Sequence, residues 1–560
     1  MTPVREDAIR TPGTAPEVES AFVAAGDSLR IAAWTLVSRL TGLLRIAAIG
    51  AVLGPTLLGN TFQFTNSLPN LVYYGFLGGS LFSSLLVPTL VPTMDAGDRR
   101  GSERIAGGFL GTALAALTVA GCAAVLVGPL LLRVGALGTQ DADVAAAQAN
   151  AARLLLVLLA PQVLLYALVG TSTAVMNARR RFALAAAAPA LENLGILVVL
   201  GVTAYLYGTG GGLESVPTSE LVLLGAGATA AAGAHAAVQW WGARRVGVSL
   251  RPRAGWRDSE VRALVRRAMP ALALAGVTAL QPLVLLVLAN RVAGGVVAVQ
   301  MGLVFYTLVI ALAVTPVALS LLPRLSRLHA QGNADGFREV LVRGLALVLF
   351  VTVPAAVGYV LVARPLAEVI AVGRMSSHQS ALLIAMTIAA IAPGLVGDGI
   401  FRVLTYAFYA RHDTRAPLRS MAAQAATFLG LACCAFLVPS EAVPLALGLA
   451  YSAASTVGAW HLALHLRASV SGVGARLAPC VRRVSAGAAA MAVPVAAVVF
   501  LVPRALDGRL GWTVATAGAV VLGAAVFVLL QAWWRAPELA WLTGGLRRRS
   551  ARAGIAGDGS

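Results

Sequence analysis

Two arginines lie inside an apolar stretch near the start of this sequence. The stretch from Ile31 to Gly54 reads IAAWTLVSRLTGLLRIAAIGAVLG and contains Arg39 and Arg45. A cation near the middle of a membrane-spanning helix costs about 2.5–3.5 kcal/mol on insertion scales, so each arginine is expected to serve a function. A guanidinium group bonds two phosphate oxygens at once, which suits an anionic substrate in a hydrated cavity. Snorkelling to the lipid headgroups is the alternative, and it fits Arg39 better than the deeper Arg45.

Three further charged residues lie within apolar segments. Glu192, in PALENLGIL, is a candidate coupling-ion site or a partner for Arg39 or Arg45, and a hydrogen-bonded contact between helices is the alternative. Asp398 and Arg402, in VGDGIFRVL, are four residues apart and can pair along one helix face. That pair is either a buried structural salt bridge or part of the cavity.

The histidines indicate packing more than chemistry. His235 and Gln239 are four residues apart, and their spacing favours interhelical bonding. His461 and His465 have metal-ligand spacing but no acidic neighbour, so no metal site is predicted there. The sequence also has no phosphate-binding glycine loop, nucleophile elbow or acidic Mg²⁺ cluster. We therefore expect neither an enzyme nor a bound cofactor or metal.

The composition identifies the class of protein that positions these residues. Hydrophobic residues make up 58% of the 560 residues and charged residues 12%. The mean hydropathy is +0.81. A membrane-spanning helix needs about 20 mainly apolar residues, and such runs recur throughout the chain. The sequence predicts an all-α polytopic membrane protein with about fourteen transmembrane helices, over 29–54, 62–95, 104–134, 146–176, 182–208, 218–243, 260–290, 296–326, 338–364, 379–410, 416–438, 443–467, 482–504 and 511–535.

The arginines predict the orientation of these helices. The even-numbered connections are rich in arginine, for example DRRGSER (98–104) and ARRRF (178–182), whereas most odd-numbered ones are poor in it. The positive-inside rule then places both termini in the cytoplasm, which an even number of spans allows. Because the arginines lie beside membrane segments, the net charge of +19 gives no reason to expect a nucleic acid as partner.

An internal repeat divides the chain. Pro88 and Pro323 follow similar apolar helices 235 residues apart, and Asn177 and Tyr409 lie 232 residues apart in similar contexts. This offset covers six helices, so we expect two six-helix lobes in the same orientation around a central cavity, plus two C-terminal helices. The predicted units are an N-terminal cytoplasmic tail (1–28), an N-lobe (29–243), a basic linker (244–259), a C-lobe (260–467), helices 13 and 14 (482–535) and a basic cytoplasmic tail (536–560).

Several motifs resemble one transporter family. SRLTGLLR (38–45) with GNTFQFTNSLPNL (59–71) is similar to the first two helices of the MurJ/MviN family of lipid II flippases, and MNARRRF (176–182) and FYARHDTRAP (408–417) continue the likeness. The resemblance implies a fourteen-helix fold in the bacterial cytoplasmic membrane, an arginine-lined cavity and alternating access. It also implies a polyprenyl-pyrophosphate-linked cell-wall precursor as substrate, and membrane lipids and other cell-wall synthesis proteins as partners.

The resemblance defines the candidate substrate-binding residues and also departs from the family pattern. The candidates are Arg39, Arg45, Asn60, Glu192, Asp398 and Arg402. Family charges are replaced at Ile46, Asn60, Tyr73, Tyr74 and Gly78, and near Leu303 and Val304. The alternatives are a flippase for another polyprenyl-linked glycan, a transport-inactive paralogue, a drug exporter of the same superfamily and, from a different class, a lipid-linked glycosyltransferase.

Overall fold

The computed structural model describes residues 15–77, 86–137, 141–467 and 470–541, and the described part is almost entirely helical. The longer helices are α1 (Ala15–Leu53), α2 (Leu57–Leu77), α4 (Val87–Asp95), α5 (Arg99–Ala136), α6 (Ala142–Leu159), α7 (Pro161–Ala178), α8 (Phe182–Tyr207), α9 (Thr218–Arg245), α10 (Ser259–Ala289), α11 (Gly295–Val309), α12 (Thr315–Ala330), α13 (Ala334–Ile370), α14 (His378–Ile391), α15 (Gly394–Ala410), α16 (Arg415–Ala432), α17 (Val443–Arg467), α18 (Val473–Ala505) and α19 (Gly508–Trp533).

Some of the fourteen predicted segments consist of two helices in succession, and the breaks have local causes. Proline has no backbone N–H and interrupts the hydrogen-bond ladder. Pro161 separates α6 from α7, and Pro393 lies between α14 and α15. Between α11 and α12 a π-helical turn, η3 (Ile310–Val314), precedes Pro316. Such turns are often found at functional sites, and this one packs against α13 and α15.

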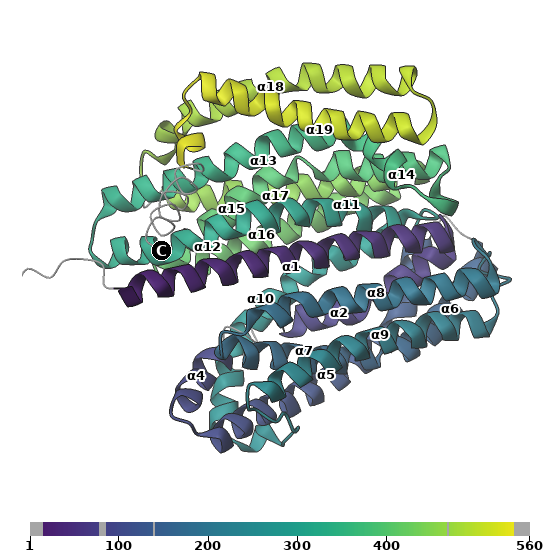
Figure 1. Cartoon of the computed structure of the whole chain (residues 1–560). Helices are drawn as coiled ribbons and strands as arrows, with labels where there is room; N and C mark the ends of the chain where they lie inside the picture. Colours follow the sequence, from purple (N-terminus) through teal and green to yellow (C-terminus); the bar gives the residue numbers. More distant parts are fainter. Residues whose placement is uncertain (1–14, 78–85, 138–140, 468–469, 542–560) are drawn as a thin grey trace, which may run out of the picture.

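The helices form two lobes with α1 between them (Figure 1). One lobe contains α2 and α5 to α9, and the other contains α11 to α17. Two helices bridge the lobes in equivalent ways. Helix α1 packs on α8 of its own lobe and on α11 of the other, while α10 packs on α16 and on α2. Helices α8 and α16 hold equivalent places in the two halves, and so do α2 and α11. The contacts of α1 and of α10 are therefore equivalent, as two six-helix repeats in the same orientation require.

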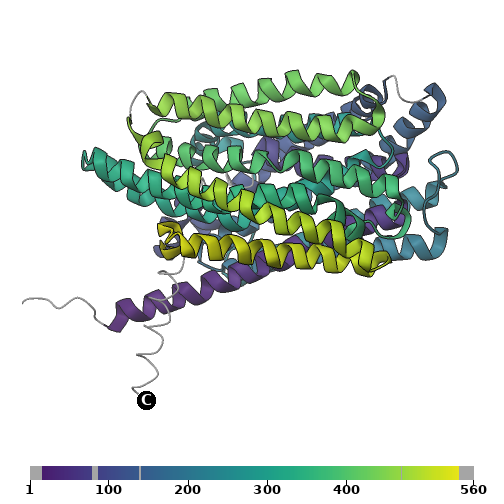
Figure 2. The same ribbon diagram turned by 90° about the horizontal axis from the view of Figure 1, so that it is seen from above.

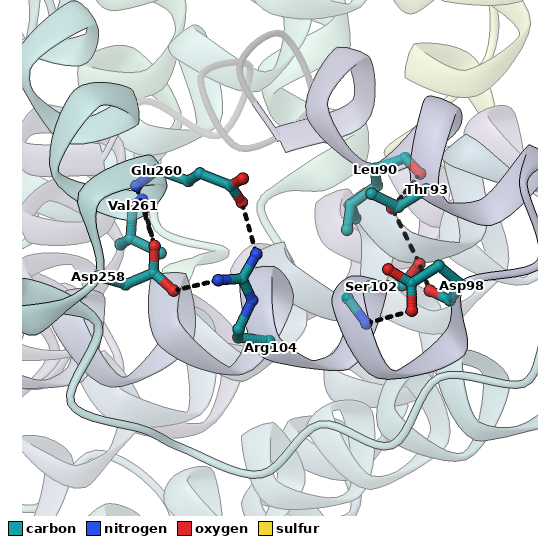
Figure 3. Close-up of polar contacts among 9 residues, drawn as sticks. Leu90, Thr93, Asp98, Ser102, Arg104, Asp258, Glu260 and Val261 are labelled. Carbon is teal, nitrogen blue, oxygen red and sulfur yellow. Dashed lines mark hydrogen bonds and ion pairs between the residues drawn. The ribbon is translucent and has the colours of Figure 1, made fainter.

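The arginine-rich connections meet at one end of the bundle. The Arg104 guanidinium donates to Glu260 at 3.0 Å and lies 3.3 Å from Asp258, so the start of α5 is joined to the start of α10 (Figure 3). Asp98 caps α5 by accepting a hydrogen bond from the Gly101 backbone. We call this the basic end.

The lobes are packed together at the opposite end, which we call the sealed end. The Gly210 N–H, after α8, donates to the Val52 carbonyl at the end of α1. Met375, in the short helix η4 (Gly373–Met375) after α13, is fully buried in the same core as Leu53. The two lobes therefore share one hydrophobic core at this end.

The C-terminal helices α18 and α19 pack on each other and on α13, outside both lobes (Figures 1 and 2). The sequence predicts a tail over 536–560, but its first residues fold back. Glu538 is buried against Arg483 of α18 at 2.7 Å, and Arg343 of α13 lies over the Trp541 ring. This short stretch is therefore part of the packed structure, and the assignment of 536–560 to a cytoplasmic tail stays a prediction.

The first turns of α1 lie within the predicted N-terminal tail, 1–28. Helix α1 begins at Ala15 and runs without a break into the apolar stretch, and in Figure 2 its first turns stand apart from the other helices. Pro16 in the first turn and the acidic residues Glu17 and Glu19 are typical of a helix start. The assignment of 1–28 to the cytoplasm stays a prediction.

Twelve helices in the described part of the chain are long and apolar enough to cross a membrane. The two predicted spans outside this count are 62–95, which includes the undescribed residues 78–85, and 260–290, where the apolar stretch within the described residues is Ala279–Ala289. Both α2 and α10 pack inside the bundle. The protein is therefore a multi-pass helical membrane protein, and the count of fourteen stays a prediction consistent with this fold.

Candidate functional site

Two adjoining cavities lie between the lobes and share the middle of α1. One, of about 540 Å³, extends between α1, α7, α8 and α9, and the other, of about 730 Å³, extends between α1, α2, α11, α15 and α16. Arg39 and Arg45 line both of them. The walls reach Gln239, close to the end of α9, and Tyr409, at the end of α15, so both cavities extend toward the basic end. The prediction that both arginines face a cavity thus agrees with their placement.

Arg45 has an unpaired donor in the wall of the cavities. Its side chain is half-buried, and its Nε is buried with no hydrogen-bond partner among the described residues. An unpaired buried donor is costly unless something satisfies it. Arg39 lies six residues earlier on the same helix and is more exposed. The pair therefore offers an anion two guanidinium groups, one of them with a donor that the protein itself leaves open.

Helix α1 is held in register beside these arginines by an amide from α8. The Asn193 side chain donates to the Ser38 carbonyl at 3.2 Å and to the Thr41 hydroxyl at 3.1 Å. The arginines are thereby positioned by a fixed helix rather than by a loop.

Glu192 has partners that the sequence did not predict. The Tyr166 hydroxyl donates to one carboxylate oxygen at 2.8 Å, and His235 Nδ1 lies 2.8 Å from the other. All three side chains are buried, and they line the smaller cavity. Arg45 is near enough to interact electrostatically with Glu192 but makes no ion pair with it. His235 is thus bonded between helices, as its spacing indicated, and its partner is an acid.

Asp398 and Arg402 form the predicted pair, with Arg402 Nε 3.2 Å from an Asp398 carboxylate oxygen. Asp398 is mostly buried, with 12% of its side chain exposed, whereas Arg402 is 43% exposed and faces the larger cavity. Tyr306 and Tyr451 lie close to the pair and pack edge to face. The pair is therefore both a salt bridge within one helix and a part of the cavity wall.

Asn60 lies outside both cavities. It is fully buried at the sealed end, where its amide donates to the Val292 carbonyl at 2.7 Å and to the Asn290 side chain at 3.3 Å. Its Oδ1 accepts a hydrogen bond from the Val296 N–H at 3.1 Å, so Asn60 of α2 caps α11 of the other lobe. The structure does not place this residue with the other five candidates.

A row of amides in the larger cavity was missed at the sequence level. Gln63, Asn66 and Asn70 share one face of α2 through their spacing of three and four residues, and all three line this cavity. Gln300 of α11 donates to Ser67 at 3.1 Å across the lobe boundary. Polar residues at helical spacing in an otherwise apolar segment were the signal that could have revealed this wall.

Several of the residues that replace family charges line the cavities, although Asn60 does not. Ile46 and Val304 contribute to both cavities, and Tyr73 contributes to the smaller one. Nothing is described for the side chain of Tyr74, and Gly78 lies outside the described residues. Among the described lining residues, three arginines and a histidine face two acids.

Comparison with known proteins identifies the family. The family model described as "Lipid II flippase MurJ" matches residues 49–509. This chain belongs to the MurJ family. It is 26% identical over 407 residues to a probable lipid II flippase MurJ of Rhizobium tropici, covering 73% of this chain and 74% of the relative. It is 25% identical to a counterpart from Vibrio cholerae over 414 residues, 70% and 73% of the two chains.

Solved structures agree on the fold. The chain is similar to a lipid II flippase MurJ in an inward closed conformation, with a TM-score of 0.71 and 15% identity over 90% of this chain and 98% of the other. It is also similar to an inward-facing multidrug resistance transporter of the MATE family, with a TM-score of 0.61 and 13% identity over 78% and 96% of the two chains. Both solved structures therefore share the helical fold of this chain.

Proposed function

We propose that this protein is a flippase that moves a polyprenyl-pyrophosphate-linked cell-wall precursor of the lipid II type across the bacterial cytoplasmic membrane by alternating access. The observation that carries the proposal is the open Nε of Arg45, next to Arg39, in a cavity between two lobes. A pyrophosphate cannot enter hydrocarbon unaided, and two guanidinium groups match its charge and its geometry. The names of the relatives in the family point to the same substrate.

The distribution of charge supports the orientation. The basic end would face the cytoplasm, together with both chain termini, because arginine-rich connections are retained on that side. The cavities extend toward this end while the lobes are packed at the other. The structure then corresponds to a state that is closed to the outside and that receives its substrate from the cytoplasmic side.

Different parts of the two cavities would bind different parts of the headgroup. Arg39 and Arg45, at the junction of the cavities, would hold the pyrophosphate. The amide wall of the larger cavity would bond sugar hydroxyls and peptide groups. Gln63 Oε1 and Gln281 Nε2 support this, because both are buried without a hydrogen-bond partner in the described part of the chain. The Asp398–Arg402 pair lies on the same wall and offers both signs of charge.

A different polyprenyl-linked glycan would use the same pyrophosphate contacts, so the arginines alone do not distinguish it from lipid II. A cationic drug would be repelled by Arg39 and Arg45, which makes drug export the poorer explanation of these residues.

The test is rescue of cells depleted of their lipid II flippase, combined with a flipping assay on a polyprenyl-pyrophosphate glycolipid in vesicles. We expect Arg45→Ala to abolish flipping at an unchanged protein level. Arg45→Lys should restore it only partly, because an ammonium group lacks the two-pronged geometry. Arg39→Ala should act in the same direction but less severely, since Arg39 is more exposed.

The matched control is Arg153→Ala. Arg153 lies on a membrane helix, α6, but is exposed and bonds only to Asn150 in the described structure, outside the cavities. It should retain rescue and flipping. Full transport by Arg45→Ala would refute the proposed role of this residue, and failure of the unaltered protein in both assays would refute the proposed substrate.

A further inference from the structure

The Tyr166–Glu192–His235 cluster is a buried titratable group inside the membrane that the proposed function does not use. Each side chain comes from a different helix, α7, α8 and α9, and each is less than a tenth exposed. Ionisable residues at such depth are rare and mark ion or proton pathways. Packing alone would not require an acid and a histidine here.

The hydrogen bonds fix where a proton can be added. An ionised Glu192 carboxylate has no proton to donate, so the proton in its bond to His235 belongs to Nδ1. Neutral His235 then carries a bare lone pair on Nε2. That Nε2 is buried and has no hydrogen-bond partner among the described residues, although the residue lines the smaller cavity. While the imidazole is neutral, Nε2 of His235 is therefore an acceptor without a donor among the described residues.

Charge balance connects this acceptor to the substrate site. With an empty cavity, Arg45 is the nearby cation that offsets Glu192. An anion bound to Arg45 neutralises the guanidinium group, so the negative charge of Glu192 is no longer offset. Adding a proton to His235 Nε2 restores the balance, because the imidazolium then neutralises Glu192 at 2.8 Å.

We propose that His235 and Glu192 form a proton-binding site whose occupancy is coupled to anion binding at Arg45, an inference that rests on the proposed function. The proton comes from water in the cavity, and the new N–H bond forms at Nε2 while the Nδ1–H stays bonded to Glu192. By linkage, the anion raises the affinity for the proton and the proton raises the affinity for the anion by the same factor.

Neighbouring helices contribute few other titratable groups that could substitute for this site. Those that face the cluster or share its cavity are Arg39 and Arg45 from α1, Tyr73 from α2 and Tyr166 from α7. Arginine stays charged and tyrosine stays neutral near pH 7. Asp143 and Arg153 of α6, which also packs on α9, are exposed and line neither cavity. His235 is therefore the remaining candidate for proton binding among these groups.

The experiment is calorimetric titration of the full-length protein in detergent with a polyprenyl pyrophosphate. It is run in sodium-free buffers of different ionisation enthalpy, between about pH 6 and pH 8, where histidine titrates. The dependence of the observed heat on the buffer gives the number of protons taken up. We expect uptake approaching one proton per bound lipid, and an affinity that strengthens by up to about tenfold for each pH unit lowered.

Two variants locate the proton. His235→Asn keeps a donor for Glu192 but has no basic nitrogen, and Glu192→Gln keeps the Tyr166 contact but removes the charge. Both should bind the lipid without proton uptake, so one of them suffices if the other does not fold. The matched control is His461→Asn. His461 likewise bonds through Nδ1, to Ser420 at 2.8 Å, but it lies outside both cavities, and uptake should persist.

The outcomes separate this inference from the proposed function. Absence of lipid binding by the unaltered protein contradicts the proposed function itself. Lipid binding without proton uptake, or uptake that persists in both His235→Asn and Glu192→Gln, overturns the proton site alone. Affinity that depends on sodium at fixed pH and not on pH would identify a metal cation in place of the proton.

Discussion

Replacement of Asn60 should open the sealed end of the protein. Its side chain makes three hydrogen bonds to the connection between α10 and α11 and to the first turn of α11, and it is fully buried. Asn290 extends this network, because it exchanges hydrogen bonds with Gln148 of α6 at 2.9 and 3.1 Å. Side chains from α2, α6 and α10 thus hold the lobes together without any formal charge.

The magnitude follows from the one group left without a partner. Asn60→Ala would leave the Val296 N–H buried and unpaired in the sealed state, whereas the Val292 carbonyl still accepts a hydrogen bond from the Gly295 N–H at 2.9 Å. An unsatisfied buried group costs about 1–3 kcal/mol, so the sealed state should lose about that much free energy relative to a state in which water reaches this N–H. Since each 1.4 kcal/mol is a factor of ten, the equilibrium should move by at least about fivefold toward outward opening.

Labelling from outside the cell measures this shift. Val304 lines both cavities, so Val304→Cys provides a reporter in a background where Cys122, Cys433, Cys434 and Cys480 are replaced. A membrane-impermeant maleimide added to whole cells should label the reporter at least about fivefold faster with Asn60→Ala than without it.

The control for this experiment is Asn150→Ala. Asn150 is an exposed amide on α6 that accepts a hydrogen bond from Arg153 and takes no part in the seal. Its loss should leave labelling unchanged. Equal labelling rates for Asn60→Ala and the unaltered seal, at equal protein level, would show that the amides do not hold the lobes together.

Two further predictions concern charge pairs. Asp398→Ala should lower protein level or transport more than the double variant with Arg402→Ala, because the single change leaves an unpaired cation in the cavity wall; equal losses in both would argue against pairing. Glu538→Ala should destabilise the detergent-purified protein by about 3 kcal/mol through loss of the buried contact to Arg483, while lipid affinity stays unchanged; an unaltered melting temperature in a thermal-shift assay would contradict this.

The fold could be predicted because its signals are long-range and repetitive. Apolar runs of about 20 residues mark membrane helices, and the shared offset of Pro88 and Pro323 indicated two equivalent halves. The environment of Arg39 and Arg45 was predictable for a related reason, since a cation within a membrane helix must face water or a partner.

The partners of the site residues could not be predicted in the same way. His235 lies 43 residues from Glu192 in the sequence, and only the packing of α8 against α9 brings the imidazole to the carboxylate. Asn60 resembled a cavity residue by its alignment, yet it lies nearer the sealed end of α2, where the lobes exclude water. Whether a polar side chain lines the cavity or the seal depends on its depth along the helix and its direction around the helix axis. The type of residue alone gives neither.

Neutral amides hold the sealed end, whereas arginines line the cavities. This difference matches the different roles expected of the two regions. The seal must break and re-form in every cycle, and neutral amides suit this because a net hydrogen bond contributes only about 0.5–1.5 kcal/mol once water can replace it. A buried ion pair in the same place would resist opening by several kcal/mol. In the cavity, by contrast, Arg45 Nε has no hydrogen-bond partner among the described residues, and under the proposed function the substrate anion would supply that contact. Paired amides such as Asn60 and Asn290 at the sealed end, together with the unpaired Nε of Arg45, would therefore favour closure of the empty site and stabilise the occupied one.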